Sequence, residues 1–447
     1  KREESAMHLP KFLTKHVAII FLISFFVNLG FSCISPVFPY YVLALKGILT
    51  ELPEELVGTI EAYKASVELG ALMAAFMISR APMAAFVGYL SDRIGRKKII
   101  ALGLTLYFLT AVGFILSPNI PSLIIVRILQ GVSSAMVWPV AETLLTEIVD
   151  KLQRGKAMSI YVSLMNFAGI FGPSIGVAIY KLYITSVSNP DLFTALRTPF
   201  IFLAIVSFIA LISSLSLPKG RKSNIATDRS HFNFRGIKDS LNKLSTEAKR
   251  SIYVIYVNGV VNGFGMGIVN TSAVVYIIQE VAKDPAGLGM LYSISGIVTI
   301  ISSILAGHLS DKIGKRKQLI IAGYFISRPV FFIIPFIKSL WILIGFYSLA
   351  TLSFGIGMPL MRVLQADLTP TEVRGTIFGF QQTFFNSGTA AGALIGGYLC
   401  AVVSNINFNL LGSTINGIFI PFWITAILGL FTTILFWLFV TEPKKKY

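Results

Sequence analysis

The chain has 447 residues, of which 54% are hydrophobic and 13% are charged, and its mean hydropathy is +0.74. This composition excludes an ordinary soluble fold, because runs of about 20 apolar residues are long enough to cross a bilayer. The net charge of +17 does not indicate a nucleic-acid partner, since the basic residues lie in short clusters between apolar runs. Cys33 and Cys400 each lie within an apolar run, so neither a disulfide framework nor a thiolate metal site is expected.

Windows of about 19 residues predict twelve membrane-spanning helices. A backbone in the bilayer must satisfy its own hydrogen bonds, so runs of this length are helical and the fold class is all-α. The first run is long and no small-residue cleavage site follows it, so we expect it to remain as the first span. The polar stretch 54–67 suggests a helical extension of the second span outside the membrane. The predicted spans are 17–42, 66–90, 98–117, 122–147, 156–183, 198–217, 252–279, 287–309, 318–337, 340–366, 376–403 and 416–440.

Lys and Arg residues outside the spans are unevenly distributed between the two sides of the membrane. One side carries 28 of them and the other side carries six. Because basic loops remain in the cytoplasm during insertion, we expect both termini to be cytoplasmic. The localisation that we expect is the plasma membrane, with the chain as a multi-pass protein.

The sequence repeats itself with an offset of 220 residues. The repeat predicts two six-helix halves, 1–217 and 251–447, joined by the basic segment 218–250. This segment is expected to be a solvated cytoplasmic linker, either without regular structure or with a short amphipathic helix on anionic lipid headgroups. The repeated residues are Pro139 and Pro359, Arg154 and Arg374, Gly155 and Gly375, Asn166 and Asn386, Gly172 and Gly392, and Gly176 and Gly396.

Two charged stretches follow the second and eighth spans at an offset of 219 residues. They read GYLSDRIGRKKI at 88–99 and GHLSDKIGKRKQ at 307–318. Both resemble the loop signature of the major facilitator superfamily. RILQG at 127–131 is similar to the fourth-helix signature of that family, and GIFGPSIG at 169–176 is similar to the fifth-helix signature of its drug:proton antiporters. The resemblance covers almost the whole chain and implies two parallel halves that provide alternating access.

The resemblance also implies that the charged stretches form a cytoplasmic latch that holds the outward-open state. The glycines allow close helix approach, the aspartates accept hydrogen bonds from the other half, and Arg96 and Lys315 pair with carboxylates. The alternative is that these charges only set topology, which leaves their shared spacing unexplained. The predicted latch residues are Gly88, Asp92, Arg96, Glu147, Gly307, Asp311, Lys315 and Asp367.

Polar side chains within the spans are the candidates for substrate contact. Arg80 lies 12 residues before Asp92, about 18 Å along a helix and near the midplane, and its neighbours are apolar. An arginine there needs a wet cavity or a partner, and its guanidinium can bind a carboxylate or phosphate bidentately. We therefore predict a substrate with an anionic or strongly accepting group. Arg328 is expected at similar depth, and Asn28, Asn258 and Asn262 are expected at the cavity, with helix packing as the alternative for the last two.

Proton coupling has few candidate groups. Asn28 occupies a place where many drug antiporters carry an acidic residue, and an asparagine cannot carry a proton. Coupling is therefore expected at Glu142, with Arg127 of the RILQG stretch adding its charge to the proton step. Glu142 and Arg362 are related by the repeat. They either pair across the central cavity or extend separately to the interface.

We predict a secondary transporter that works by alternating access, and the Gly172–Pro173 bend favours proton-coupled export of small amphipathic compounds. An importer of sugars or organic acids and a lipid or lipid-linked-sugar flippase remain alternatives. No nucleotide loop, zinc spacing or nucleophile–base pair is present in the sequence, so neither an enzyme nor an ATP-driven pump is expected. The expected partners are a small-molecule substrate, protons and membrane lipids, without cofactors, metals or nucleic acid, and the expected state is a monomer.

Overall fold

The computed structural model of the chain describes residues 13–218, 244–369, 374–410 and 413–442. The expected linker at 218–250 therefore lies almost entirely outside the described residues. Twelve helices of the described chain are long and apolar enough to cross a membrane. This confirms the predicted number of spans and the all-α fold class.

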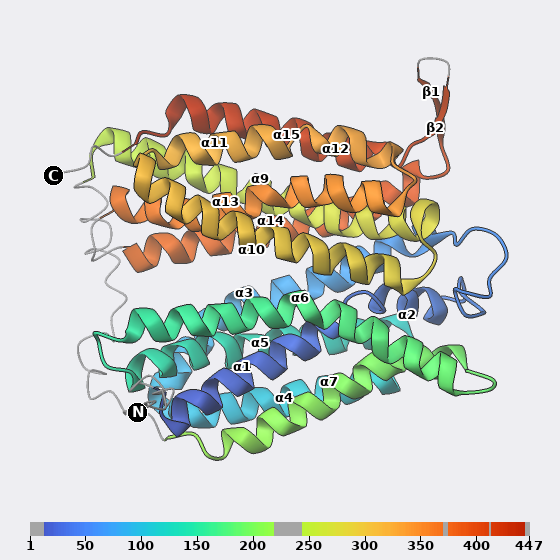
Figure 1. The fold of residues 1–447 in the computed structure, drawn as a ribbon, viewed down its shortest axis with the longest axis horizontal. Helices are drawn as coiled ribbons and strands as arrows, with labels where there is room; N and C mark the ends of the chain where they lie inside the picture. Colours follow the sequence, from blue (N-terminus) through green and yellow to red (C-terminus); the bar gives the residue numbers. More distant parts are fainter. Residues whose placement is uncertain (1–12, 219–243, 370–373, 411–412, 443–447) are drawn as a thin grey trace, which may run out of the picture.

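The first half of the chain forms one bundle, drawn in blue and green in Figure 1. Its helices are α1 (Lys15–Cys33), α2 (Phe38–Leu45), α3 (Ser66–Ile94), α4 (Arg96–Leu116), α5 (Ile120–Ile148), α6 (Arg154–Ser186) and α7 (Leu192–Ser214). A short 3-10 helix, Ala62–Ala65, precedes α3.

The second half forms a second bundle, drawn in yellow to red beside the first (Figure 1). Its elements are α9 (Thr246–Tyr276), a π-helical turn (Ile277–Val281), α10 (Pro285–Ile313), α11 (Arg316–Ser327), α12 (Val330–Ile333), a 3-10 turn (Ile334–Phe336), α13 (Leu340–Leu368), α14 (Arg374–Val403), β1 (Asn407–Leu410), β2 (Ser413–Asn416) and α15 (Phe419–Phe439). The two strands form an antiparallel hairpin that the sequence did not predict.

The helices run roughly along the long axis of the molecule, which gives it two distinct ends (Figure 1). We call the end at which α3 gives way to α4 the Asp92 end. The opposite end carries α2 and the β1–β2 hairpin, and we call it the Lys46 end. Gly95 at the α3–α4 corner and Gly314 at the α10–α11 corner have φ angles of 105° and 71°. These left-handed conformations require glycine and explain its place in both charged stretches.

Prolines divide two of the predicted spans, so the prediction of one continuous helix was wrong for each of them. The first span breaks between Cys33 and Phe38, around Pro36. The ninth span breaks after Ser327, where Pro329 follows Arg328. Proline cannot donate the helical hydrogen bond and its ring clashes with the preceding turn, which accounts for both breaks.

The predicted helical extension at 54–67 is also absent from the described chain. Residues 54–61 form turns and irregular backbone, and only the 3-10 helix Ala62–Ala65 precedes α3. Pro53 and Gly58, whose φ is 108°, interrupt helical geometry in this stretch.

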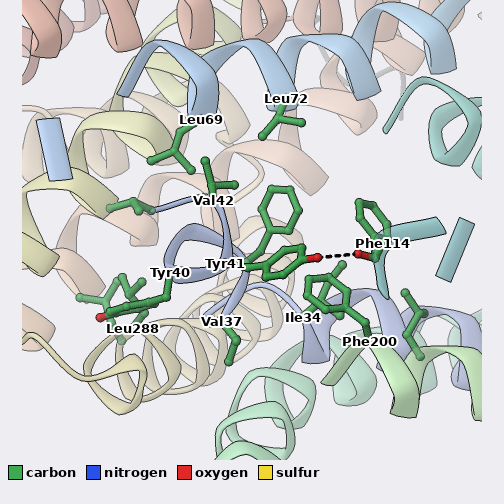
Figure 2. Close-up of a cluster of buried hydrophobic side chains, with 14 of the residues drawn as sticks. Ile34, Val37, Tyr40, Tyr41, Val42, Leu69, Leu72, Phe114, Phe200 and Leu288 are labelled. Atoms are coloured by element: carbon green, nitrogen blue, oxygen red, sulfur yellow. Dashed lines mark hydrogen bonds between the residues drawn. The ribbon is translucent and has the colours of Figure 1, made fainter. Parts of the chain in front are cut away.

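An apolar cluster at the Lys46 end joins the two halves. Tyr40 and Tyr41 of α2 are fully buried in it, together with Leu288 of α10. Figure 2 shows the Tyr41 ring beside Phe200, with its hydroxyl directed at the Phe114 carbonyl. That hydroxyl donates a hydrogen bond of 3.0 Å to the Phe114 oxygen, and the Tyr41 and Phe200 ring centroids lie 5.2 Å apart. The α2 segment is therefore a fixed part of the core.

The repeated glycines make equivalent helix contacts in the two halves. A Cβ at Gly172 would lie 2.5 Å from Ser32 Cβ, and one at Gly176 would overlap the Cys33 backbone, so α6 packs directly on α1. In the second half, a Cβ at Gly392 or Gly396 would overlap the backbone of α9 in the same way. Small residues permit this close approach within a membrane.

Gly176→Ala is expected to destabilise the protein by about 1–3 kcal/mol, because its new methyl group would meet the Cys33 carbonyl. The matched control is Gly345→Ala in α13, where a Cβ meets nothing within 4 Å. Thermal unfolding in detergent should therefore show a lower midpoint for the first variant and no loss for the second. Equal midpoints would contradict the close α1–α6 contact.

Candidate functional site

A cavity of about 570 Å³ lies between the two halves, and we call it the central cavity. The first half contributes α1, α2, α3, α5 and α6 to its wall, and the second half contributes α9 and α10. Most lining side chains are apolar, including Phe31, Phe38 and Met266, while Arg127 and Asn270 supply polar groups. An apolar cavity with a few fixed polar groups is the usual form of a small-molecule site.

Two further cavities extend from the central cavity into the second half. The middle cavity has a volume of about 280 Å³ and shares Met266 and Asn270 with the central cavity. The Arg328 pocket, of about 90 Å³, shares Asn262, Arg328 and other residues with the middle cavity. The three spaces therefore form a series that leads from the interface between the halves to a buried arginine.

Arg328 lies at the break in the ninth span, directly after α11. Only 6% of its surface is exposed. Its Nη2 donates to Asn262 Oδ1 at 2.5 Å, its Cζ lies 4.4 Å from the Tyr324 ring centroid, and its Nε has no partner. No carboxylate among the described residues lies within ion-pair distance of it.

Three residues predicted from sequence, Asn258, Asn262 and Arg328, come together in this pocket. Asn258 and Asn262 each donate through Nδ2 to the Tyr324 hydroxyl, at 3.1 and 3.2 Å. Asn258 is 1% exposed and its Oδ1 has no partner. The seventh-span asparagines therefore face a cavity and also tie α9 to α11.

The sequence analysis missed Tyr324, Gln365 and Gln381, which complete the wall of the pocket. Gln365 Nε2 and Gln381 Oε1 are buried without a partner. Tyr324 precedes Arg328 by four residues, the spacing that puts two side chains on one helix face, so a search of that face would have found it. Nothing in the sequence distinguishes the two glutamines from helix-packing residues.

Arg80 does not reach these cavities. Its guanidinium lies over the Trp138 ring, 4.7 Å from the centroid, and 5.9 Å from the centroid of Phe76. Among the described residues it has no ion pair and no hydrogen bond through its side chain. Stacking on an indole stabilises a desolvated cation, so Trp138 supplies part of the compensation that the sequence expected from a wet cavity or a partner.

Arg127 lines the central cavity and is held by aromatic rings. Its Cζ lies 3.9 Å from the Phe38 centroid and 5.4 Å from the Phe114 centroid. Its Nη1 donates to Gln130 Oε1 at 2.8 Å, while its Nε has no partner. Its charge is therefore placed at the cavity wall.

Asn28 is committed to helix packing in this conformation. Its Nδ2 donates to the Met165 carbonyl of α6 at 2.5 Å, and its side chain is partly buried. The interaction joins α1 to α6 beside the close contacts of Gly172 and Gly176.

Glu142 and Arg362 do not pair with each other. Both side chains are exposed, and the described residues contain no ion pair for either. Arg362 lines the Arg328 pocket. Glu142 lies on α5, near enough to Tyr161 of α6 for its charge to act on that hydroxyl.

The halves contact each other through the backbone where α3 meets α14. Ser66 Oγ donates to the Gly397 carbonyl at 2.7 Å. One turn further along, a Cβ at Gly70 would overlap the Ala393 carbonyl. This contact lies at the Lys46 end and leaves no space for a side chain or solvent between the two helices.

A second contact between the halves joins α6 to α10. Ser293 Oγ donates to the Ile170 carbonyl at 2.6 Å and lies 2.8 Å from Ser174 Oγ, and Lys181 Nζ lies 2.6 Å from Asp284 Oδ2. Within the described ranges, every hydrogen bond and ion pair between the halves lies between the middle of the molecule and the Lys46 end. The structure is therefore closed at that end.

The irregular segment before α3 adds a carboxyl to this closure. Tyr180 donates its hydroxyl to Glu54 Oε2 at 2.9 Å. Burial raises the pKa of the Glu54 carboxyl, so this group takes up a proton at a higher pH than a free glutamate does.

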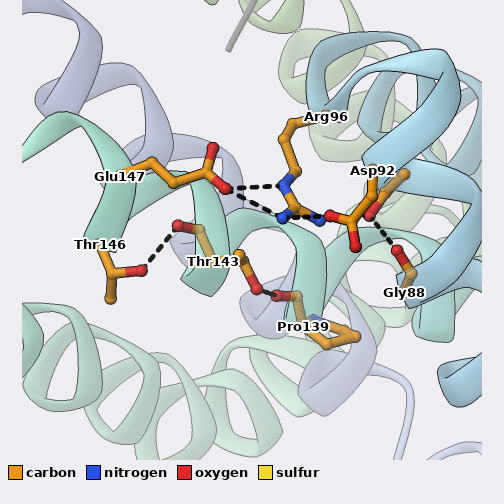
Figure 3. A network of polar contacts seen from close by, with 8 residues as sticks. Gly88, Asp92, Arg96, Pro139, Thr143, Thr146 and Glu147 are labelled. Carbon is orange, nitrogen blue, oxygen red and sulfur yellow. Dashed lines mark hydrogen bonds and ion pairs between the residues drawn. The ribbon is translucent and has the colours of Figure 1, made fainter. Parts of the chain in front are cut away.

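Figure 3 shows the charged cluster at the Asp92 end of the first half. Arg96, the first residue of α4, lies between two carboxylates. Its Nη2 is 2.5 Å from Asp92 Oδ1 and 2.9 Å from Glu147 Oε1, and its Nε donates to Glu147 at 3.1 Å. The cluster therefore ties α3, α4 and α5 of one half to one another.

The second half has an equivalent arrangement with one change. Arg316, rather than the expected Lys315, pairs with Asp367. The helices α4 and α11 begin at Arg96 and Arg316, 220 residues apart, so the residue gained in the repeat lies at the α10–α11 corner and moves Lys315 out of register. Lys315 and Asp311 are exposed and make no ion pair with any described residue.

Gly88 and Gly307 were expected to permit a close helix approach. In this conformation a Cβ built at either glycine meets nothing within 4 Å. No hydrogen bond or ion pair between described residues joins the two charged clusters to the opposite half. The latch residues therefore lie in two clusters, one within each half.

Comparison with known proteins agrees with this architecture. The sequence profile described as Major Facilitator Superfamily matches residues 20–252 and 255–447. The chain therefore belongs to the Major Facilitator Superfamily, and it is a membrane transporter rather than an enzyme.

Two relatives and one solved structure are informative. Multidrug resistance protein 2 of Bacillus subtilis (strain 168) is 25% identical over 394 residues, 86% of this chain and 89% of the relative. Quinolone resistance protein NorA of Staphylococcus aureus (strain Mu50 / ATCC 700699) is 24% identical over 388 residues, 87% and 90% of the two chains. The crystal structure of a D-xylose-proton symporter superposes with a TM-score of 0.69 and 19% identity, over 97% of this chain and 99% of that one, and shows the common fold.

Cysteines at Ser174 and Ser293, in a background with Cys33→Ser and Cys400→Ser, are expected to form a disulfide because the two hydroxyl oxygens lie 2.8 Å apart. Oxidation should hold α6 against α10 and stop transport, and reduction should restore it. With a protease site engineered into the 218–250 segment, the cut halves should stay joined on a non-reducing gel. Each single-cysteine variant is the control, and separation of the oxidised double-variant halves would refute this contact.

Proposed function

We propose that this transporter exports small amphipathic compounds from the cell in exchange for protons. The observation that carries the proposal is the series of largely apolar cavities with a few fixed cationic and amide groups, which begins between the two halves and is closed at the Lys46 end. The names of the two relatives, a multidrug resistance protein and a quinolone resistance protein, support export.

The same fold carries sugar transport in the D-xylose-proton symporter, so a sugar importer is the second candidate. A sugar site requires hydrogen-bonding groups around most of the ligand. The phenylalanine and methionine side chains of the central cavity favour an apolar body instead.

The proposed orientation places the Asp92 end in the cytoplasm. The 28 Lys and Arg residues that flank the spans on that side, against six on the other, support cytoplasmic termini in the plasma membrane. In this orientation the structure is closed toward the outside. The halves 1–217 and 251–447 are proposed to move as rigid bodies within a monomer, with 218–250 as their linker.

We assign the proton step to Glu142, with Arg127 acting through its charge at the wall of the central cavity. Glu142 is the candidate because its carboxyl is exposed on α5 and has no ion pair among the described residues. A carboxyl in such a place can take up and release a proton as the solvent side changes.

The test is transport by the purified protein in liposomes with an imposed pH gradient, using lipophilic cations, organic anions and sugars as substrates. Glu142→Gln should abolish accumulation driven by the gradient, because glutamine carries no proton. Exchange of substrate at equal pH should continue within about twofold, since exchange needs no net proton transfer. Full gradient-driven accumulation by the variant would exclude Glu142 as the coupling group, and transport of sugars alone would exclude the proposed substrate class.

We further propose that the two charged clusters meet helices of the opposite half when the Asp92 end closes. The open space beside Gly88 and Gly307 would then receive a helix, and Asp92 and Asp311 would accept its hydrogen bonds. In the closed-outside conformation the carboxylates are held within their own halves or exposed.

Asp92→Asn and Asp311→Asn are therefore each expected to slow transport at least tenfold at unchanged expression, because each removes a charged acceptor from the closed state. Uptake should be measured beside the amount of protein in the membrane. Glu51→Gln, in the irregular segment at the Lys46 end, is a matched exposed-carboxylate control. Normal transport by both aspartate variants would refute the latch.

A further inference from the structure

The second half holds a buried guanidinium that no described residue neutralises. Arg328 is almost fully buried, and its interactions are one hydrogen bond to Asn262 and the face of the Tyr324 ring. It follows the last residue of α11, where the negative end of the helix dipole favours a cation. Arginine does not give up its proton in proteins, so the site keeps a positive charge.

The pocket also holds hydrogen-bonding groups that lack partners. Arg328 Nε, Gln365 Nε2 and Asn258 Oδ1 are buried and unpaired. The Tyr324 hydroxyl accepts from two asparagines, so its own proton remains available to another acceptor. Buried groups of this kind are costly unless a ligand or water satisfies them.

The charge around these groups has one sign. No Asp or Glu lines the central cavity, the middle cavity or the Arg328 pocket, whereas Arg127, Arg328 and Arg362 do. Low-dielectric walls strengthen the field of these arginines, which attracts anions and opposes cations. The walls between the arginines are apolar, with Met266, Phe331 and others in the middle cavity.

We propose that the Arg328 pocket binds the carboxylate of a monoanionic amphiphile whose apolar body occupies the middle and central cavities. The proposal rests on the proposed function and names the class of its substrate. A volume of about 90 Å³ suits a small head group, and the guanidinium fork can bind two coplanar oxygens. One buried positive charge balances one negative charge, so a dianionic phosphate fits less well.

The test uses four ligands with the same ring and different head groups. These are 2-naphthoate, 2-naphthyl phosphate, 2-naphthylmethanol and 2-naphthylmethylammonium. Binding to the full-length protein in neutral detergent is measured by titration calorimetry. We expect 2-naphthoate to bind at least tenfold more tightly than the alcohol and the ammonium compound, and more tightly than the phosphate. Tightest binding of the phosphate would overturn the carboxylate assignment and indicate a phosphate head group.

Two variants test the role of Arg328 itself. Arg328→Gln removes the charge and should weaken binding of 2-naphthoate by about 10- to 100-fold. Asn262→Asp places a carboxylate where Oδ1 already meets the guanidinium, so it should neutralise Arg328 without leaving a buried charge and weaken binding to a similar extent. The second variant tests the proposal even where the first does not fold. Arg197→Gln is the control, because Arg197 is partly buried on α7 and lines none of the three cavities.

Unchanged binding by a folded Arg328→Gln or Asn262→Asp protein would overturn the assignment to this pocket. Transport in liposomes separates this result from the proposed function. Transport of the ammonium compound without binding of 2-naphthoate would overturn the anion proposal and leave amphiphile export intact. Binding of 2-naphthoate that depends on Arg328, without transport of any amphiphile, would support the anion site and refute the proposed function.

Discussion

The contact between the backbones of α3 and α14 is the constraint on which the arrangement of the two halves depends. Helices in a bilayer gain no hydrophobic driving force from meeting each other, so close packing and hydrogen bonds must hold them. Gly70, Gly397 and Ser66 supply both at the Lys46 end. Because this contact brings the halves together at one end, the central cavity, the burial of α2 and the isolation of the charged clusters at the other end all follow from it.

The arginines of the spans are stabilised by three different means. Arg127 and Arg80 lie over aromatic rings, Arg96 and Arg316 lie beside carboxylates, and Arg328 lies at a helix terminus beside amides. Only the second kind is electrically neutral as it stands. The charges near the cavities therefore remain uncompensated, which distinguishes the binding region from the clusters at the Asp92 end.

Hydropathy and the internal repeat were sufficient to predict the twelve spans, and paired motifs were sufficient to locate the Arg96–Glu147 cluster. The breaks after Cys33 and Ser327 were visible as prolines, but a window average conceals a local loss of one hydrogen bond. The Arg328 pocket could be predicted only in part. Asn258, Asn262 and Arg328 are far apart in sequence, and their meeting depends on how α9 and α11 pack, while Tyr324 and Gln365 resemble ordinary packing residues until their neighbours are known.

The repeat separates what the two halves share from what only one of them has. The charged clusters and the packing glycines occur in both halves, as expected for parts that operate when the halves move together. Arg328 and Tyr324 correspond through the 220-residue offset to Phe108 and Leu104, and Phe108 packs against Phe208 at 5.5 Å between ring centroids. The first half thus has an apolar contact where the second half has a cationic pocket. A ligand held there would bind chiefly to one half, and its head group would travel with that half during alternating access.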